Sequence, residues 1–293
     1  MSAAPGNVAA SVRQRLSNVA KERGEDFEQV LVRYALERLL YRLSKSRHVE
    51  NFVLKGALLF RLWFDLEQRP TRDADFLGFG PADTKLLHTI FRELIELKID
   101  HNDGLVFDVA SLKAEEIRKD AGYPGVRVSL QAELARARIP VQCDIGFGDA
   151  VTPEPTRQHY PTLLDMPAPT LRAYPLETVV AEKLEALVKL GAFNSRLKDY
   201  FDLWVLMRYE QLGRELIPQA IHATFERRGT KLPDAIPAGL SEEFAGAKAT
   251  MWLAFLKRSG LKAPVLSEVV SALREFYWPL LQSAAGAKMV TTK

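Results

Sequence analysis

Apolar residues at helical spacing mark several stretches of the chain. Val12, Leu16, Val19 and Ala20 share one face of a helix predicted over residues 12–23, and Gly24 separates it from a second helix predicted over residues 27–44. The same spacing predicts further helices over residues 82–99, 176–190, 196–207, 216–225, 244–256 and 266–281. The second half of the chain is therefore expected to be mainly helical.

Basic residues recur along the second predicted helix. Arg33, Arg38, Arg42 and Lys45 give this segment a basic side. A solvated charged face is the favoured interpretation, since charge runs on helices mostly contact water. A surface for RNA phosphates is the alternative.

Three apolar runs predict strands over residues 105–109, 126–130 and 139–145. Side chains alternate between the two faces of a strand, so Val141, Cys143 and Ile145 point one way while Gln142 and Asp144 point the other. Asp144 is therefore expected on the polar face of the third strand. A surface aspartate on an edge strand is the plain interpretation of that position.

The stretch over residues 52–77, FVLKGALLFRLWFDLEQRPTRDADFL, organises the chain. It predicts a strand, a tight turn at Lys55, Gly56 and Ala57, an apolar helix that runs to residue 64, a loop, and a strand that contains Asp73 and Asp75. The alternation of a strand places both carboxylates on one face, within reach of one divalent cation. A glycine turn that leads into a helix also presents backbone N–H groups to phosphate.

These features together indicate a metal-bound nucleoside triphosphate. An Asp-x-Asp sequence alone is weak evidence, because most such pairs are solvated turn or edge residues. The order of the motifs within one strand-helix-strand unit strengthens the interpretation, as does the sequence Arg69-Pro70-Thr71-Arg72 directly before the acids.

A proline-rich loop over residues 151–175 is the best candidate for a linker. It suggests two domains, a core with N-terminal helices over residues 1–160 and a helical domain over residues 161–293 that completes the active site. In the helix that follows, Lys183 falls within the apolar stripe, which is uncommon for a lysine unless it is paired, lies at a site or snorkels to water. Gly191 ends that helix, and a helical hairpin would return Arg196, Asp199 and Asp202, which share a face, toward Lys183.

With these motifs the sequence resembles the AbiEii/AbiGii toxins, also known as MenT, within the DNA polymerase β-like nucleotidyltransferase superfamily. The resemblance covers about residues 12–206. It implies an α+β (α/β) fold in which helices flank a mixed β-sheet, with a mainly helical C-terminal domain. Ala57 departs from the superfamily pattern, in which a serine or a second glycine is common at this position.

The resemblance also implies roles for individual residues. Asp73 and Asp75 would be catalytic and would bind metal, with Asp144 as the third metal ligand. Lys183 would contact the nucleotide phosphates, and Asp199 would be a supporting or catalytic acid. Nucleotide binding is further expected from the turn and loop residues Lys55, Gly56, Ala57, Thr71 and Arg72.

Composition restricts the alternatives only in part. With 40 Lys and Arg against 37 Asp and Glu, the net charge of +3 does not signal strong nonspecific binding of nucleic acid. The single Cys143 excludes an intrachain disulfide and fits a reducing cytoplasm. We expect no contact with a membrane, since no apolar stretch is long enough to span one.

We therefore expect a cytoplasmic toxin of a toxin–antitoxin or phage-defence system. It would use Mg²⁺ or Mn²⁺ to transfer a nucleotide from an NTP to RNA, namely the 3′ end of tRNA, and a cognate antitoxin would control it. A non-catalytic NTP-binding regulator and a small-molecule nucleotidyltransferase are the alternatives.

Overall fold

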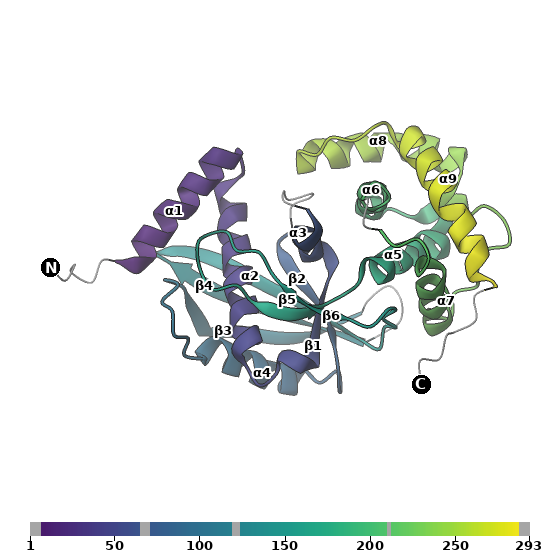
Figure 1. Cartoon of the computed structure of the whole chain (residues 1–293). Helices are drawn as coiled ribbons and strands as arrows, with labels where there is room; N and C mark the ends of the chain where they lie inside the picture. The colour runs from purple at the N-terminus through teal and green to yellow at the C-terminus, as the bar shows by residue number, and fades with distance from the viewer. Residues whose placement is uncertain (1–6, 65–70, 119–123, 210–211, 287–293) are drawn as a thin grey trace. The chain divides into compact units, whose positions relative to one another are not determined.

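The computed structural model describes residues 7–64, 71–118, 124–209 and 212–286 (Figure 1). The chain divides into two compact units. The sheet unit comprises Met1–Gly148 and Thr156–Ala173, and the helical unit comprises Asp149–Pro155 and Tyr174–Lys293. No helix in the described ranges is both long and apolar enough to cross a membrane.

The described part of the sheet unit contains seven strands in the order β3-β4-β5-β2-β1-β7-β6. Parallel pairing joins β2 to β5 and β1 to β7, whereas the other neighbouring pairs are antiparallel. The strands are β1 (Phe52–Lys55), β2 (Asp73–Gly78), β3 (Val106–Arg118), β4 (Pro124–Leu134), β5 (Ala137–Phe147), β6 (Thr156–His159) and β7 (Thr170–Ala173). The expected α+β fold with a mixed sheet is thus confirmed.

Two of these strands lie where the sequence predicted only a proline-rich linker. Within residues 151–175, β6 and β7 form an antiparallel pair, and Ala173 of β7 aligns with Leu54 of β1. Each strand is only four residues long, so its alternation of apolar and polar residues is too brief to stand out against the surrounding prolines. The prediction of a loop over this whole segment was wrong.

Helices α1 (Val8–Arg23), α2 (Phe27–Lys45) and α4 (Thr84–Glu96) belong to the sheet unit, in which α1 packs on α2 and α4 packs on β3. Asn7, Asp26 and Asp83 cap their N-termini by accepting backbone N–H groups. The ring of Phe91 on α4 packs edge-on against Phe52, which does the same with Phe76. The face of the sheet that carries Phe76 is therefore its apolar, helix-covered face.

Helix α2 does not have the basic outer face predicted for it, because every residue from Val30 to Leu43 is buried. Arg33 pairs with Glu25, and Arg38 donates to the carbonyl oxygen of Pro167 at 3.0 Å. Arg42 forms two hydrogen bonds to Asp103, at 2.6 and 3.3 Å. Arg38 also pairs with Glu37 at 3.0 Å. Because all three arginines form internal ion pairs, both the solvated face and the RNA surface are wrong for them, and Lys45 alone of the four is exposed.

The described part of the helical unit contains α5 (Leu176–Leu190), α6 (Leu197–Leu206), α7 (Ile217–Arg228), α8 (Glu242–Ser259) and α9 (Leu266–Ala284), shown in green to yellow in Figure 1. Helix α5 packs on α6 and α7, and α9 packs on α6, α7 and α8. The hydroxyl groups of buried Tyr200 and Tyr277 donate to backbone carbonyls, as does the indole of Trp252. These three aromatic residues are fully buried in the core of the helical unit.

Candidate active site

The candidate site begins with a row of four charged residues that crosses four neighbouring strands. Lys55 of β1 aligns with Asp75 of β2, Asp75 aligns with Asp144 of β5, and Asp144 aligns with Arg127 of β4. Directly paired residues project from the same face of a sheet. We call Lys55, Asp75, Asp144 and Arg127 the charged row. Its two carboxylates lie between two cations.

The charged row lies on the face of the sheet opposite Phe76. Ala74 and Phe76 are buried, whereas Asp73 and Asp75 are half-buried, which confirms the alternation predicted for this strand. Because Phe76 belongs to the helix-covered face, the two carboxylates project away from α4. The apolar half of β2 thus anchors the strand in the core while its acidic half faces the other side.

Gly56 lies directly against Asp75. Its φ of +75° falls in the left-handed region, and a Cβ atom built on it would be 2.1 Å from Oδ2 of Asp75. No side chain fits at that distance, so glycine is required both by the backbone conformation and by the approach. From the sequence, the turn at Gly56 was expected to approach a phosphate group. In this structure the group next to Gly56 is the carboxylate of Asp75.

Arg127 and Asp144 form a bidentate pair. The Nε and Nη2 atoms of Arg127 donate to the two carboxylate oxygens of Asp144, each at 2.8 Å. The bond to Asp144 is the main cause that raises the pKa of Arg127, and the charges of Asp144, Asp73 and Asp75 add to it. The guanidinium of Arg127 is therefore in the electrostatic field of all three predicted acids.

The environment of Asp144 corrects one interpretation and adds a residue that sequence reasoning missed. Its strand β5 lies between β4 and β2, so Asp144 is not a surface aspartate on an edge strand. Arg127 was not singled out, although it alternates with Val126 and Val128 in a predicted strand. The alternation predicts that Arg127 lies on a polar face of its strand. It does not predict that Asp144 lies opposite Arg127, because that depends on the register between β4 and β5.

The other predicted residues of the sheet unit differ in their contacts and burial. The hydroxyl of Thr71 donates to Oδ1 of Asp73 at 2.7 Å. Lys55 and Ala57 are buried and Arg72 is exposed. Arg69 and Pro70 of the predicted basic loop lie outside the described residues.

Helix α3 (Phe60–Trp63) is shorter than the sequence predicted. Gly56–Leu59 forms a 3-10 turn, and α3 adds a single helical turn before the backbone becomes extended at Phe64. Peptide dipoles add along a helix, so a segment of this length has a smaller dipole than the longer helix expected from the sequence. The backbone of Gly56 and the side chain of Lys55 lie beside Asp75.

The acidic strand fits a magnesium nucleotide better than a metal held by protein alone. Within the described ranges, no three His, Cys, Asp or Glu side chains are arranged to hold a metal ion. Mg²⁺ usually binds one or two carboxylates and completes its shell with water and substrate phosphates. Asp73 and Asp75 on one face of β2 meet that requirement, whereas Asp144 is paired with Arg127.

The helical unit holds the second predicted cluster. Nζ of Lys183 on α5 donates to Asp199 at 2.8 Å and to Asp202 at 2.6 Å, both on α6. The predicted helical hairpin is confirmed, and Lys183 is paired with carboxylates rather than snorkelling to water. Burial by itself raises the pKa of Asp199, but the charges of Lys183 and Arg196 outweigh it and lower that pKa to about 2.

The comparison with protein families identifies the class of protein. Residues 38–276 match the family described as "Nucleotidyl transferase AbiEii toxin, Type IV TA system". This match includes both predicted clusters and most of both units, so the chain belongs to the AbiEii family of nucleotidyltransferase toxins of type IV toxin–antitoxin systems. The prediction of a nucleotidyltransferase is confirmed.

Two solved structures resemble the chain. The crystal structure of JHP933 from Helicobacter pylori is 15% identical, with a TM-score of 0.53 over 89% of this chain and 95% of that one. A "putative nucleotidyltransferase from H. pylori" is 14% identical, with a TM-score of 0.47 over 90% of this chain and 99% of that one. The similarity to JHP933 supports the fold and no functional conclusion. No curated protein matches the chain.

Proposed function

We propose that the protein transfers a nucleotide from an NTP, bound with Mg²⁺ or Mn²⁺, to an RNA acceptor. The acceptor proposed is the 3′ end of a tRNA, whose modification would block translation. The alignment of Lys55, Asp75 and Asp144 in one row, with Asp73 two residues from Asp75 on the same strand, supports this most directly. It gathers carboxylates and a cation, which a metal-bound triphosphate requires.

Asp73 and Asp75 would hold the metal. Asp144, whose two oxygens accept from Arg127 in this structure, would become the third ligand by exchanging one of those bonds for the metal. The bound metal would neutralise charge on the triphosphate and lower the pKa of the attacking hydroxyl. Lys55 would add positive charge near the phosphates, and the left-handed turn at Gly56 would let backbone N–H groups approach them. Thr71 would keep the carboxylate of Asp73 in position through the bond that it donates. Pyrophosphate would leave.

The helical unit enters the proposal through Lys183 and Asp199. Lys183 is proposed to contact the nucleotide phosphates, Asp199 is proposed to support catalysis, and the helical region is proposed to complete the active site. Their ion pair is well shielded, since the side chains of Lys183 and Asp199 are 13% and 3% exposed. A variant at either position must therefore be tested for folding as well as for transfer.

A type IV toxin implies a cognate antitoxin and an NTP substrate. We place the reaction in the cytoplasm, where tRNA and NTPs occur together. A small-molecule acceptor and a non-catalytic regulatory role give different outcomes in the experiment that follows.

The test supplies each of the four labelled NTPs with Mg²⁺, Mn²⁺ or a chelator, and offers bulk RNA or a mixture of small hydroxyl compounds as acceptor. We expect label in RNA of tRNA size, dependent on metal. Asp73→Asn and Asp75→Asn should each lower the transfer rate by about a thousandfold or more, since a lost metal ligand removes several kcal/mol of transition-state stabilisation.

Asp165→Asn is the matched control, because Asp165 is an exposed aspartate outside the candidate site. It should transfer at the wild-type rate. Label in small molecules alone would replace the RNA acceptor. Full activity of both strand variants, or toxicity that persists in them without transfer, would contradict the proposed chemistry.

A further inference from the structure

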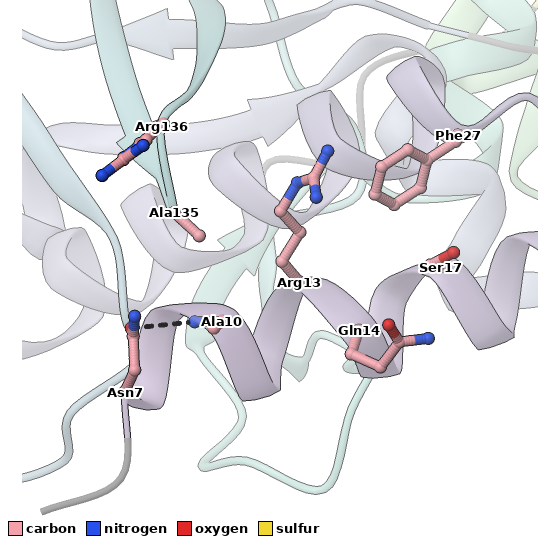
Figure 2. A pocket seen from close by; sticks show the side chains of 8 residues that line it. All are labelled: Asn7, Ala10, Arg13, Gln14, Ser17, Phe27, Ala135 and Arg136. Carbon is pink, nitrogen blue, oxygen red and sulfur yellow. Dashed lines mark hydrogen bonds between the residues drawn. The ribbon is translucent and has the colours of Figure 1, made fainter.

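A pocket of about 520 Å³ lies in the sheet unit between α1 and the turn that joins β4 to β5 (Figure 2). Its polar and aromatic wall is formed by Asn7, Arg13, Gln14, Ser17, Phe27 and Arg136. None of these residues belongs to the charged row. A pocket of this volume can hold a ligand the size of a nucleotide.

The pocket is positively charged. Arg13 and Arg136 are exposed, no Asp or Glu lines the pocket, and within the described ranges neither arginine forms an ion pair with a carboxylate. Figure 2 shows the guanidinium of Arg13 beside the ring of Phe27, with Cζ 5.6 Å from the ring centroid. A wall with two cations and no acid favours an anionic ligand.

The polar groups of the wall can donate hydrogen bonds to such a ligand. The Oδ1 atom of Asn7 accepts the backbone N–H of Ala10, so its other amide atom, Nδ2, is a donor (Figure 2). The hydroxyl of Ser17 can donate as well, and each guanidinium offers several N–H groups. Donors outnumber acceptors in this wall, and the ligand that complements it is rich in acceptor oxygens, as phosphate is.

The turn that carries Arg136 is the second observation. Leu134 and Ala137 pair across the β4–β5 hairpin, and the two residues between them, Ala135 and Arg136, have φ of 48° and 68°. Two-residue hairpin turns with positive φ at both positions favour Asn and Gly. This chain instead places an alanine and an arginine there, and residues in such sparsely populated conformations cluster at ligand-binding and active sites.

We propose that this pocket binds a phosphate of the RNA backbone, at a place distinct from the site of transfer. Arg13 and Arg136 would contact the phosphate oxygens, and Ser17 and Asn7 would donate to the same group. The inference rests on the proposed RNA acceptor. Such a contact would hold the body of the RNA without reading its sequence, because phosphate contacts position a nucleic acid whereas base contacts specify it.

The test measures binding of fluorescently labelled bulk tRNA by anisotropy, between about 50 and about 300 mM salt, with full-length protein that carries Asp73→Asn to prevent transfer. Arg13→Gln and Arg136→Gln should each weaken binding several-fold and reduce the slope of log K against log salt by about one, as loss of one phosphate contact does. Arg15→Gln is the matched control, because Arg15 is an exposed arginine of α1 that does not line the pocket. It should leave both quantities unchanged.

The outcomes separate this inference from the proposed function. If both pocket variants bind tRNA with the wild-type affinity and the wild-type salt slope, the phosphate-binding role of the pocket is overturned, even where the enzyme labels RNA. If the protein does not bind RNA, that role is overturned as well. Displacement of the tRNA by polyglutamate at equal charge concentration would overturn it in favour of an acidic protein partner. Loss of slope in the two variants, in a protein that labels only small molecules, would support the pocket and contradict the proposed acceptor.

Discussion

Arg127 holds Asp144 through two hydrogen bonds of 2.8 Å each, and Asp144 aligns with Asp75 on the neighbouring strand. Without the guanidinium, two carboxylates on adjacent strands would face each other with no cation on the Asp144 side. Like charges directly opposite each other destabilise a sheet. The pair therefore fixes the orientation of the Asp144 carboxylate beside the acidic strand and places a cation against it.

Replacement of Arg127 should reveal this coupling. We expect Arg127→Gln to destabilise the protein by about 1–2 kcal/mol, a modest value because the side chain of Arg127 is 41% exposed. Asp144→Asn in the same chain should recover part of the loss. Urea unfolding of the four proteins in the double-mutant cycle measures the coupling. Arg92→Gln, which breaks the surface pair with Glu96, is the control and should change little; additive effects of the first two substitutions would contradict the coupling.

Gly56→Ala should inactivate the enzyme by displacing Asp75. The added Cβ would lie 2.1 Å from Oδ2 of Asp75, so the carboxylate must move, and a misplacement of about 1 Å can cost about a hundredfold in rate. Gly24→Ala is the matched control, since Gly24 also has a positive φ of 66° but nothing lies within 4 Å of its added Cβ. Steady-state transfer rates should fall only in the first variant. Equal rates would show that Gly56 does not position Asp75.

Substitutions at Thr71 should act through the carboxylate of Asp73. The hydroxyl of Thr71 donates to that carboxylate, so Thr71→Ser should keep activity and Thr71→Val should lower it several-fold. Thr71→Glu adds a negative charge beside Asp73 and should lower transfer by about a hundredfold or more. Thr89→Glu on the exposed side of α4 controls for added charge. An active Thr71→Glu enzyme would remove Thr71 from the site.

The ion pair of Lys183 with Asp199 should make the free energy of unfolding depend on pH in the acidic range. The pKa of Asp199 is lowered to about 2 from its ordinary value of 3.8, so its contribution of about 2 kcal/mol is present above about pH 4 and is lost as pH falls toward 2. Lys183→Met leaves Asp199 without its main cation and should destabilise the protein by roughly 3 kcal/mol at pH 7.

The difference between that variant and the wild type should shrink below about pH 4, because Asp199 of the unfolded chain then binds a proton, whereas Asp199 of the folded wild type does so only near pH 2. Thermal unfolding of both proteins at a series of pH values from 7 to 3 measures this difference in stability. Lys189→Met, which changes a half-exposed lysine of the same helix, should run parallel to the wild type. A constant difference for Lys183→Met across this range would show that ionised aspartates are not its partners.

Local sequence patterns predicted the features that depend on neighbours close in sequence. The alternation of Asp73 and Asp75 with Ala74 and Phe76 defined both faces of β2, and the spacing of Lys183 from Asp199 and Asp202 defined a hairpin of adjacent helices. In each case the interacting residues lie on one element or on consecutive elements.

Features that depend on distant segments could not be predicted in this way. Arg42 resembles a solvent-facing residue of an amphipathic helix, but in the fold it is buried and its charge is paired with Asp103, which lies 61 residues away in sequence. Arg127 gains its role from an alignment between strands, and strand register is decided by packing and turns across the whole sheet. The spacing of apolar residues describes a single helix or strand. It does not show which other helix or strand will pack against it.

The parallel pairing of β1 with β7 has a consequence for the order in which the protein is made. Leu54 leaves the ribosome long before Ala173, the residue with which it aligns. Synthesis proceeds at about 5–20 residues per second, so β1 waits for several seconds before its second neighbour exists. During that interval the strand that ends at Lys55, next to Gly56, has an unpaired edge. The nascent chain therefore cannot complete its seven-stranded sheet until the ribosome has passed residue 173, which leaves the cell a short period in which the chain is present and the sheet that carries the charged row is unfinished.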